Sequence, residues 1–426
     1  MFGQLFTTIL APVLGLFVVA TGNGFISSLT TLRLDAAGAS ALAVGLISSA
    51  YFIGLTLGGF FNDRLIARVG HIRAYSGFVS VISVSVLLQG LFASPTFWFI
   101  LRLVNGWATL GVFLVVESWL LLSGTPKQRG RLLALYMIAL YGSTMLGQLI
   151  LGDIDAAGPT VPFILAGILA SLSVLPMVII PRISPVMERV QPLRFGDLLR
   201  MTSTGVMGCF GSGVAIAAVY TLLPLYLQHV GMSVDEVGNL MSATILGAML
   251  LQYPVGRWSD HKDRQTVLIA LGFLCLVDSL LILMLPSTPA FLALPLFLLG
   301  GGIFAIYPVA VSHSADKAGP EDLVRMIQGL LLVNSIGSAI SPLLISLLMG
   351  RVGSAGLFWA MAALNLCMAL FFLRRRQQSP APTPVAPFEP AAQMSPTGVE
   401  IRVTEDLIRG SMMDSTVGAP ASDQAH

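Results

Sequence analysis

The feature that most constrains this chain is a series of apolar stretches, each long enough to cross a lipid bilayer. The hydrocarbon core of a bilayer is about 30 Å thick and takes roughly 20 helical residues to span. Hydrophobic residues make up 55% of the 426-residue chain and charged residues 10%, whereas soluble domains carry about 25% charged residues. We therefore predict an all-α integral membrane protein with twelve transmembrane helices. The expected spans are 8–31, 41–62, 73–94, 96–122, 132–152, 160–181, 203–228, 236–257, 265–286, 290–313, 324–349 and 355–374.

The loops between these spans differ in charge from one side of the membrane to the other. Lys and Arg gather in the loops that follow the even-numbered spans, whereas the opposite loops hold Arg33 and Arg351. Because Lys and Arg favour cytoplasmic loops, we expect both termini to be cytoplasmic.

The two halves of the chain repeat each other. "GFFND" (Gly59–Asp63) ends the second span, and "GRWSD" (Gly256–Asp260) ends the eighth span. Other pairs follow in the same register: Gly106 with Gly302, Glu117 with His313, and Arg129 with Arg325. Matching pairs at corresponding helix positions indicate two pseudo-symmetric six-helix bundles. The expected organisation is a first bundle (1–181), a cytoplasmic linker (182–202), a second bundle (203–374) and a disordered, Pro-, Ala- and Ser-rich cytoplasmic tail (375–426).

These motifs resemble those of the major facilitator superfamily. Its loop signature is present as Gly59, Asp63 and Arg64 and again as Gly256, Asp260 and Arg264, and its fourth-span signature as Arg102 followed by Gly106. The stretch "ESWLLLSGTPKQRGRLLALYMIALYGSTMLGQ" (117–148) most resembles the bacterial YcaD-type branch. The resemblance implies the major facilitator fold and a location in the bacterial inner membrane. It also implies two bundles that rock around a central cavity and move a small solute by alternating access.

The repeated loop signature suggests a gate. Gly59 and Gly256 remove side chains where helices of opposite halves could approach, and Asp63 and Asp260 could face the positive N-terminal ends of the eleventh and fifth spans. Arg64, Arg264 and Arg129 would complete the charge cluster. The alternative interpretation is that the basic residues only mark topology.

The fourth span carries two charges in apolar surroundings. Arg102, Asn105, Thr109 and Glu117 follow helical spacings and form one stripe. A charge facing lipid costs roughly 2.5–3.5 kcal/mol on insertion scales, so the stripe is expected to face the protein interior.

Three interpretations of Glu117 stay open: a proton carrier, a permanent ion-pair partner, or a ligand for a cationic substrate. Arg102 is a candidate for binding an anionic substrate, for tuning a proton site, or for bonding to a neighbouring helix. His313 is the repeat counterpart of Glu117 and a candidate switch, although its place near the end of the tenth span favours a solvated imidazole.

Other polar residues at helical spacing are expected to line the cavity, and aromatic surface is expected from Tyr51, Tyr220 and Tyr307. The polar candidates are Asn23, Ser27, Asn105, Thr109, Tyr141, Thr144, Gln148, Asn334 and Ser338.

The leading function is a proton-coupled secondary transporter that acts as a monomer, with the bilayer, a small solute and protons as partners. The alternative is a transporter-like sensor or partner-binding membrane protein without net transport. We expect no enzyme activity, since the sequence offers no paired carboxylates, metal-ligand cluster or nucleophile–base set, and we expect no cofactor, metal or nucleic acid.

Overall fold

The protein consists of long helices over every part of the chain that the structure describes. The structure is a computed structural model, and it describes residues 2–123, 129–178, 195–318 and 320–378. Twelve segments in these ranges are long and apolar enough to cross a membrane, which confirms the predicted fold class. Arg129 is placed only as part of the backbone, and residues 182–194 of the expected linker and 379–426 of the expected tail lie outside the described residues.

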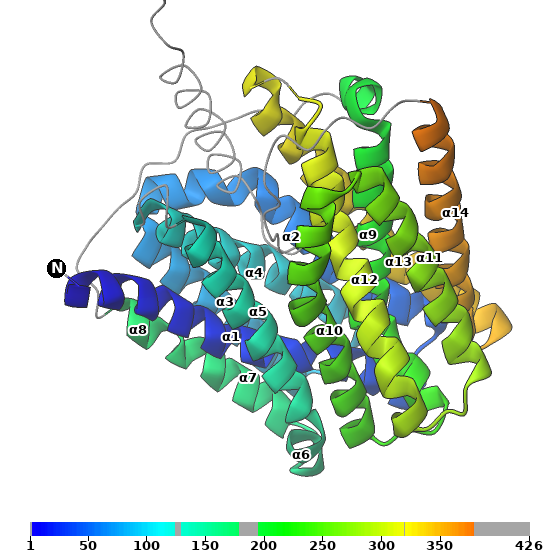
Figure 1. Ribbon diagram of the computed structural model, residues 1–426. Coiled ribbons are helices and arrows are strands. Elements are labelled where there is room, and N and C mark those ends of the chain that lie inside the picture. Colours follow the sequence, from blue (N-terminus) through cyan, green and yellow to red (C-terminus); the bar gives the residue numbers. More distant parts are fainter. Residues whose placement is uncertain (1, 124–128, 179–194, 319, 379–426) are drawn as a thin grey trace, which may run out of the picture.

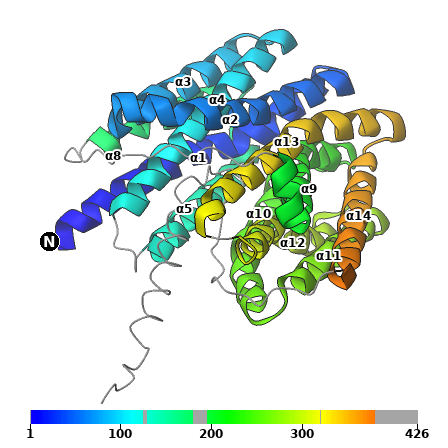
Figure 2. The same cartoon turned by 90° about the horizontal axis from the view of Figure 1, so that it is seen from above.

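Each half supplies six of these spans. The first half contains α1 (Phe2–Ala36), α2 (Ala41–Val69), α3 (His71–Leu91), α4 (Pro95–Ser123), α5 (Arg129–Leu149), α6 (Leu151–Ala156), α7 (Val161–Leu172) and α8 (Val174–Val178). The second half contains α9 (Phe195–His229), α10 (Val234–His261), α11 (Arg264–Met284), α12 (Pro289–Ala315), α13 (Pro320–Val352) and α14 (Gly356–Gln378). Helices α7 and α8 together form one span, and the two halves lie side by side as separate bundles (Figures 1 and 2).

Several helices run past the ends expected from the sequence. Helix α2 continues to Val69 and ends at Gly70, whose φ of 87° is a conformation that favours glycine. The first loop signature therefore lies within the last turns of α2. Helix α11 begins one residue after Asp263. The Asp263 carboxylate caps the helix by accepting a hydrogen bond from the backbone N–H of Gln265. Helix α9 starts at Phe195, inside the expected linker, and breaks at Thr202, where φ is −147° and ψ is 72°.

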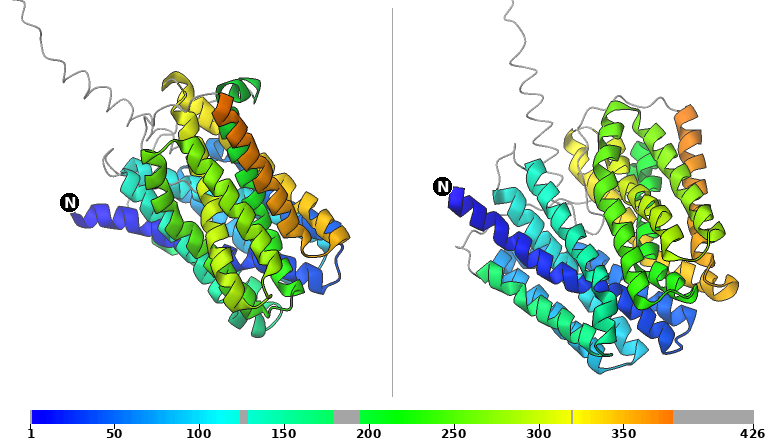
Figure 3. Two further views of the ribbon diagram at one scale, coloured as in Figure 1. Left: turned by 45° about the vertical axis from the view of Figure 1, so that its right-hand side comes forward. Right: turned by 60° about the horizontal axis from the view of Figure 1, so that its bottom comes forward.

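The two faces of the molecule are named here by their loops. The motif face is where α2 meets α3 (69–71) and where α10 meets α11 (261–264). The opposite face is where α1 meets α2 (36–41) and where α9 meets α10 (229–234). The two bundles converge toward the opposite face and diverge toward the motif face (Figures 1 and 3).

Contacts between the halves cluster near the opposite face. Asp35 in α1 pairs with His229 in α9 at 2.9 Å, and the Ser242 hydroxyl in α10 donates to the Met145 carbonyl in α5 at 3.1 Å. Helices α2 and α13 also approach closely, since a Cβ on Gly45 would lie 2.9 Å from the Leu343 Cα. Glycine permits this approach, and the opposite face is thus closed by direct contact between the bundles.

Candidate functional site

A small cavity lies between the two halves. It is lined by α1, α2, α4 and α5 of the first half and by α9 and α12 of the second. Its volume of about 40 Å³ holds roughly three water molecules, at 10–15 Å³ for each water centre. Six of its lining residues are aromatic: Tyr51, Phe52, Phe113, Tyr141, Tyr220 and Phe304. In this conformation the cavity is too small for most organic solutes and has to widen to hold one.

Four of the polar residues expected to line the cavity do so. They are Asn23 and Ser27 on α1 and Tyr141 and Thr144 on α5. The Thr144 hydroxyl donates to the Leu140 carbonyl of its own helix, as hydroxyls in membrane helices commonly do. Asn23 is different, because its amide donates across to the Tyr51 hydroxyl on α2 at 2.9 Å. Asn23 and Tyr51 therefore form a polar pair on the wall supplied by the first half.

Arg102 lies behind this pair. Its guanidinium carbon is 4.5 Å from the centre of the Tyr51 ring, within the range of a cation–π contact. The side chain is 1% exposed, and its Nε and Nη1 atoms have no hydrogen-bond partner among the described residues. Arg102 is thus a buried cation whose nearest identified contact is an aromatic ring of the cavity wall.

The rest of the α4 stripe is buried within the first half. The Asn105 amide donates to the Ser85 hydroxyl on α3 at 3.2 Å, and the Thr109 hydroxyl donates to the Asn105 side chain at 3.5 Å. Glu117 is fully buried, four residues beyond Phe113, which lines the cavity. The stripe faces the protein, as its charges require, but these three side chains are not part of the cavity wall.

Three further polar residues join helices within one half. The Gln148 amide on α5 donates to the Gly24 carbonyl and the Ser28 hydroxyl on α1, both at 2.8 Å. In the second half, Asn334 on α13 donates to the Cys209 carbonyl at 2.9 Å, and Ser338 to the Gly213 carbonyl at 3.1 Å. These bonds tie α5 to α1 and α13 to α9 at related places in the repeat.

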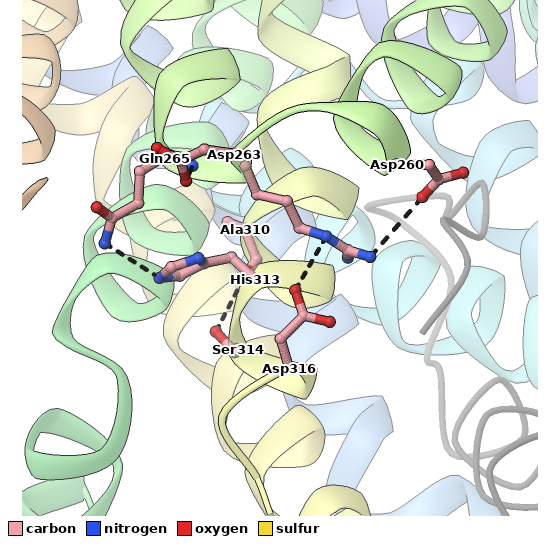
Figure 4. A network of polar contacts seen from close by, with 8 residues as sticks. Asp260, Asp263, Gln265, Ala310, His313, Ser314 and Asp316 are labelled. Atoms are coloured by element: carbon pink, nitrogen blue, oxygen red, sulfur yellow. Dashed lines mark hydrogen bonds and ion pairs between the residues drawn. The ribbon is translucent and has the colours of Figure 1, made fainter. Parts of the chain in front are cut away.

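A charged cluster occupies the motif face of the second half (Figure 4). Arg264, at the start of α11, contacts Asp316 through Nε at 3.0 Å and Asp260 at 3.7 Å. The Arg264 and Asp316 side chains are both 1% exposed. Asp263 pairs with Arg376 of α14 at 3.1 Å. Partial burial, with Arg375 nearby, lowers the pKa of Lys317 at the edge of this cluster.

His313 belongs to the same cluster. The imidazole Nε2 of His313 lies 3.5 Å from the side-chain amide nitrogen of Gln265 on α11 (Figure 4), and His313 is 1% exposed. The expectation of a solvated imidazole is therefore wrong, because α11 covers this end of α12.

The motif face of the first half is arranged differently. His71, at the start of α3, contacts the Ser118 hydroxyl on α4 at 3.0 Å through Nε2. One carboxylate oxygen of Asp63 is buried without a hydrogen-bond partner among the described residues. Arg64 is exposed, and a Cβ on Gly59 would lie 3.8 Å from Leu110 of the same half. Among the described residues, Gly59 therefore marks no close approach between the halves in this conformation. The side chain of Arg129 lies outside the described residues.

Several residues of these sites were not singled out from the sequence. Asp316, Asp263 and Arg376 resemble ordinary loop charges, and a signal for them exists only once α11, α12 and α14 are packed together. Phe52 and Phe304 sit in apolar runs where most aromatic side chains face lipid or helix cores. The position of Phe304 two residues after Gly302, a repeat-matched glycine, is the one cue the sequence offers.

The comparisons with known proteins agree with this geometry. The sequence pattern of the Major Facilitator Superfamily matches residues 12–233 and again residues 205–411. The chain is 32% identical over 371 residues to an uncharacterised MFS-type transporter, YcaD, of Salmonella arizonae, covering 86% of this chain and 96% of that protein. It is 33% identical over 374 residues to YcaD of Salmonella enteritidis, with the same coverage.

Solved structures share the fold at low sequence identity. A bacterial homologue of the human lysosomal transporter Spinster, in an inward-facing and occupied conformation, has a TM-score of 0.71 at 15% identity, over 87% of this chain and 96% of that one. The nucleoside transporter NupG has a TM-score of 0.69 at 12% identity, over 87% of this chain and 98% of that one. A D-xylose–proton symporter has a TM-score of 0.69 at 14% identity, over 87% of this chain and 97% of that one.

Proposed function

Because the chain belongs to the major facilitator superfamily of membrane transporters, we propose that it moves a small solute across the bacterial inner membrane by alternating access, driven by protons. The observation that carries this proposal is the cavity between two bundles that touch at the opposite face and diverge at the motif face. A transporter of this kind binds its solute between the bundles and rocks them to change the open side.

The distribution of basic residues supports an orientation. Arg64, Arg68 and Arg73 lie at the motif face of the first half, and Lys262 and Arg264 at that of the second. Since Lys and Arg favour the cytoplasmic side, we place the motif face and both termini in the cytoplasm. The conformation described here then opens inward.

The proton-coupling part of the proposal rests on Glu117. A carboxylate within a membrane helix is costly and commonly belongs to an ion pathway or proton relay. Glu117 is fully buried and lies one helical turn beyond the cavity residue Phe113, on the stripe of α4 that faces the protein interior.

The test uses purified protein in proteoliposomes, with a panel of labelled sugars, nucleosides, amino acids and carboxylates and an imposed pH gradient. We expect at least one solute to accumulate in a gradient-dependent way. Glu117→Gln should abolish accumulation but preserve exchange at equal pH, because exchange moves no net protons. Asp278→Asn, which neutralises a buried carboxylate on α11 away from the cavity, is the matched control and should accumulate solute normally.

Each outcome of this test has a separate meaning. Accumulation by Glu117→Gln at the wild-type level would contradict the proton role. Loss of accumulation, exchange and stability together would favour a structural ion pair. Failure of every solute to accumulate would favour the sensor over the transporter.

A further inference from the structure

We propose that the central cavity binds an organic anion with a flat apolar body, and that Arg102 supplies the positive charge that selects it. The inference rests on the proposed transport function and names the substrate class of the same cavity. It is carried by the juxtaposition of an unpaired buried guanidinium, a tyrosine–asparagine pair and a cavity with aromatic walls.

Arg102 carries a buried charge that no described carboxylate balances. Its side chain is 1% exposed in the middle of a membrane bundle, and it forms no ion pair with a described carboxylate. A buried charge without a counter-ion is strongly unfavourable, and a cation–π contact with Tyr51 offsets only part of that penalty. An anion that arrives in the cavity would provide the missing counter-charge.

Tyr51 connects Arg102 to the cavity. Tyr51 lies between them, since its ring packs against the guanidinium and the residue lines the cavity. The Tyr51 oxygen accepts a hydrogen bond from Asn23, and a phenol also carries one O–H donor, which we assign to the bound anion. The adjacent positive charge strengthens such a bond to an anion.

No charged side chain among the described lining residues competes with Arg102 for a ligand in the cavity. Among the described residues that line the cavity none is charged, and the hydroxyls of Thr144 and Thr221 donate to carbonyls of their own helices. The repeat position that matches Arg102 in the second half is Leu298, at the offset that relates Gly106 to Gly302. At these two matched positions, the positive charge is therefore carried by the first half.

The walls indicate the shape of the body. Tyr141 and Tyr220 each pack edge-to-face on Phe304, with the ring centre of each tyrosine 5.7 Å from that of Phe304. Phe52 and Phe113 line the cavity on the side of the first half. Aromatic walls of this kind favour a flat ring that can stack or insert edge-on. A planar carboxylate satisfies both the wall and the buried cation.

The test compares ligands that differ mainly in charge. Full-length protein in nanodiscs is titrated by calorimetry with benzoate, benzamide and benzylammonium, and with phenylacetate, phenylacetamide and phenethylammonium. We expect each carboxylate to bind at least about tenfold more tightly than its amide, as a charge-assisted hydrogen bond implies, and the ammonium compounds to bind most weakly.

Two variants assign this preference to the proposed residues. Arg102→Gln should remove the preference for carboxylate over amide. Tyr51→Phe is the milder second variant, because it keeps the ring against the guanidinium and removes only the hydroxyl. It should reduce the preference by about tenfold. Tyr226→Phe is the matched control, since it removes a hydroxyl from a buried tyrosine of α9 that packs on Phe358 and does not line the cavity, and should change the preference less than threefold.

Four outcomes would overturn the inference: carboxylates that bind no better than amides, tighter binding of ammonium compounds, no carboxylate binding at millimolar concentration, or an unchanged preference in both Arg102→Gln and Tyr51→Phe. Binding in nanodiscs needs no transport. Carboxylate binding without uptake would therefore refute the transport proposal alone, and uptake of neutral solutes without carboxylate preference would refute this inference alone.

Discussion

The starts of α3 and α11 occupy corresponding places in the two halves but are held in different ways. At the start of α3, His71 meets the Ser118 hydroxyl of α4. At the start of α11, Arg264 forms a buried ion pair with Asp316 at the end of α12. Nearby, Asp263 is engaged by Arg376, whereas one oxygen of Asp63 has no partner among the described residues.

The two halves therefore match in position at these helix starts but differ in the contacts made there. In the second half, ionic contacts join α11 to α12 and α14 at the motif face. In the first half, a hydrogen bond does the local joining and the carboxylate of Asp63 is left available. We therefore propose that Asp63 makes a contact between the halves when the motif face closes.

The largest effect is expected from breaking the ion pair of the second half. Arg264→Gln removes the charge that contacts the buried Asp316 carboxylate, which should lower the free energy of unfolding by about 3–5 kcal/mol. Unfolding of purified protein in detergent by increasing denaturant measures this change. The double variant Arg264→Gln with Asp316→Asn should recover part of the loss, and a double variant no more stable than the single one would argue against the pairing.

A smaller effect is expected at the corresponding place in the first half. Ser118→Ala removes the partner of His71 and should cost about 0.5–1.5 kcal/mol, the usual net value of a hydrogen bond. The same denaturant titration provides the measurement. A loss as large as that of Arg264→Gln would remove the contrast between the halves.

The smallest effect is expected at the rim of the charged cluster. The Arg376 side chain is 48% exposed, and exposed ion pairs contribute about 0–1 kcal/mol. Arg376→Ala should therefore lower stability by less than about 1 kcal/mol. Repeating the titration at high salt should shrink even this difference, and a change that salt leaves intact would indicate a packing role instead.

Much of the fold follows from sequence, because hydropathy and repeat offsets report directly on lipid exposure and symmetry. The burial of Arg102 and Glu117 follows in the same way, since lipid excludes charge. The helical spacing of polar residues indicates that a helix has a polar face, but it does not indicate whether that face contacts the cavity or another helix. Gln148 and Asn334 have the spacing of cavity residues, yet they bond to neighbouring helices because those helices lie closer to them than the cavity does.

Other features depended on packing between distant segments. The burial of His313 requires α11 to cover the end of α12. The aromatic walls combine residues from α2, α4, α5, α9 and α12. Single-sequence patterns carry no distance between such segments, so these features had no local signal.

The most direct test of the central assignment is a distance measurement across the motif face. Spin labels would be placed at Leu135 on α5 and Tyr253 on α10, both exposed, after replacement of the exposed Cys367 by serine; Cys209 and Cys275 are buried. Pulsed electron paramagnetic resonance would be recorded for the parent protein, for Asp63→Asn, and for Asp263→Asn as the control in the second half. We expect a short-distance, closed population in the parent that Asp63→Asn loses and Asp263→Asn retains. Identical distance distributions in the parent and Asp63→Asn, or equal losses in the two variants, would contradict it.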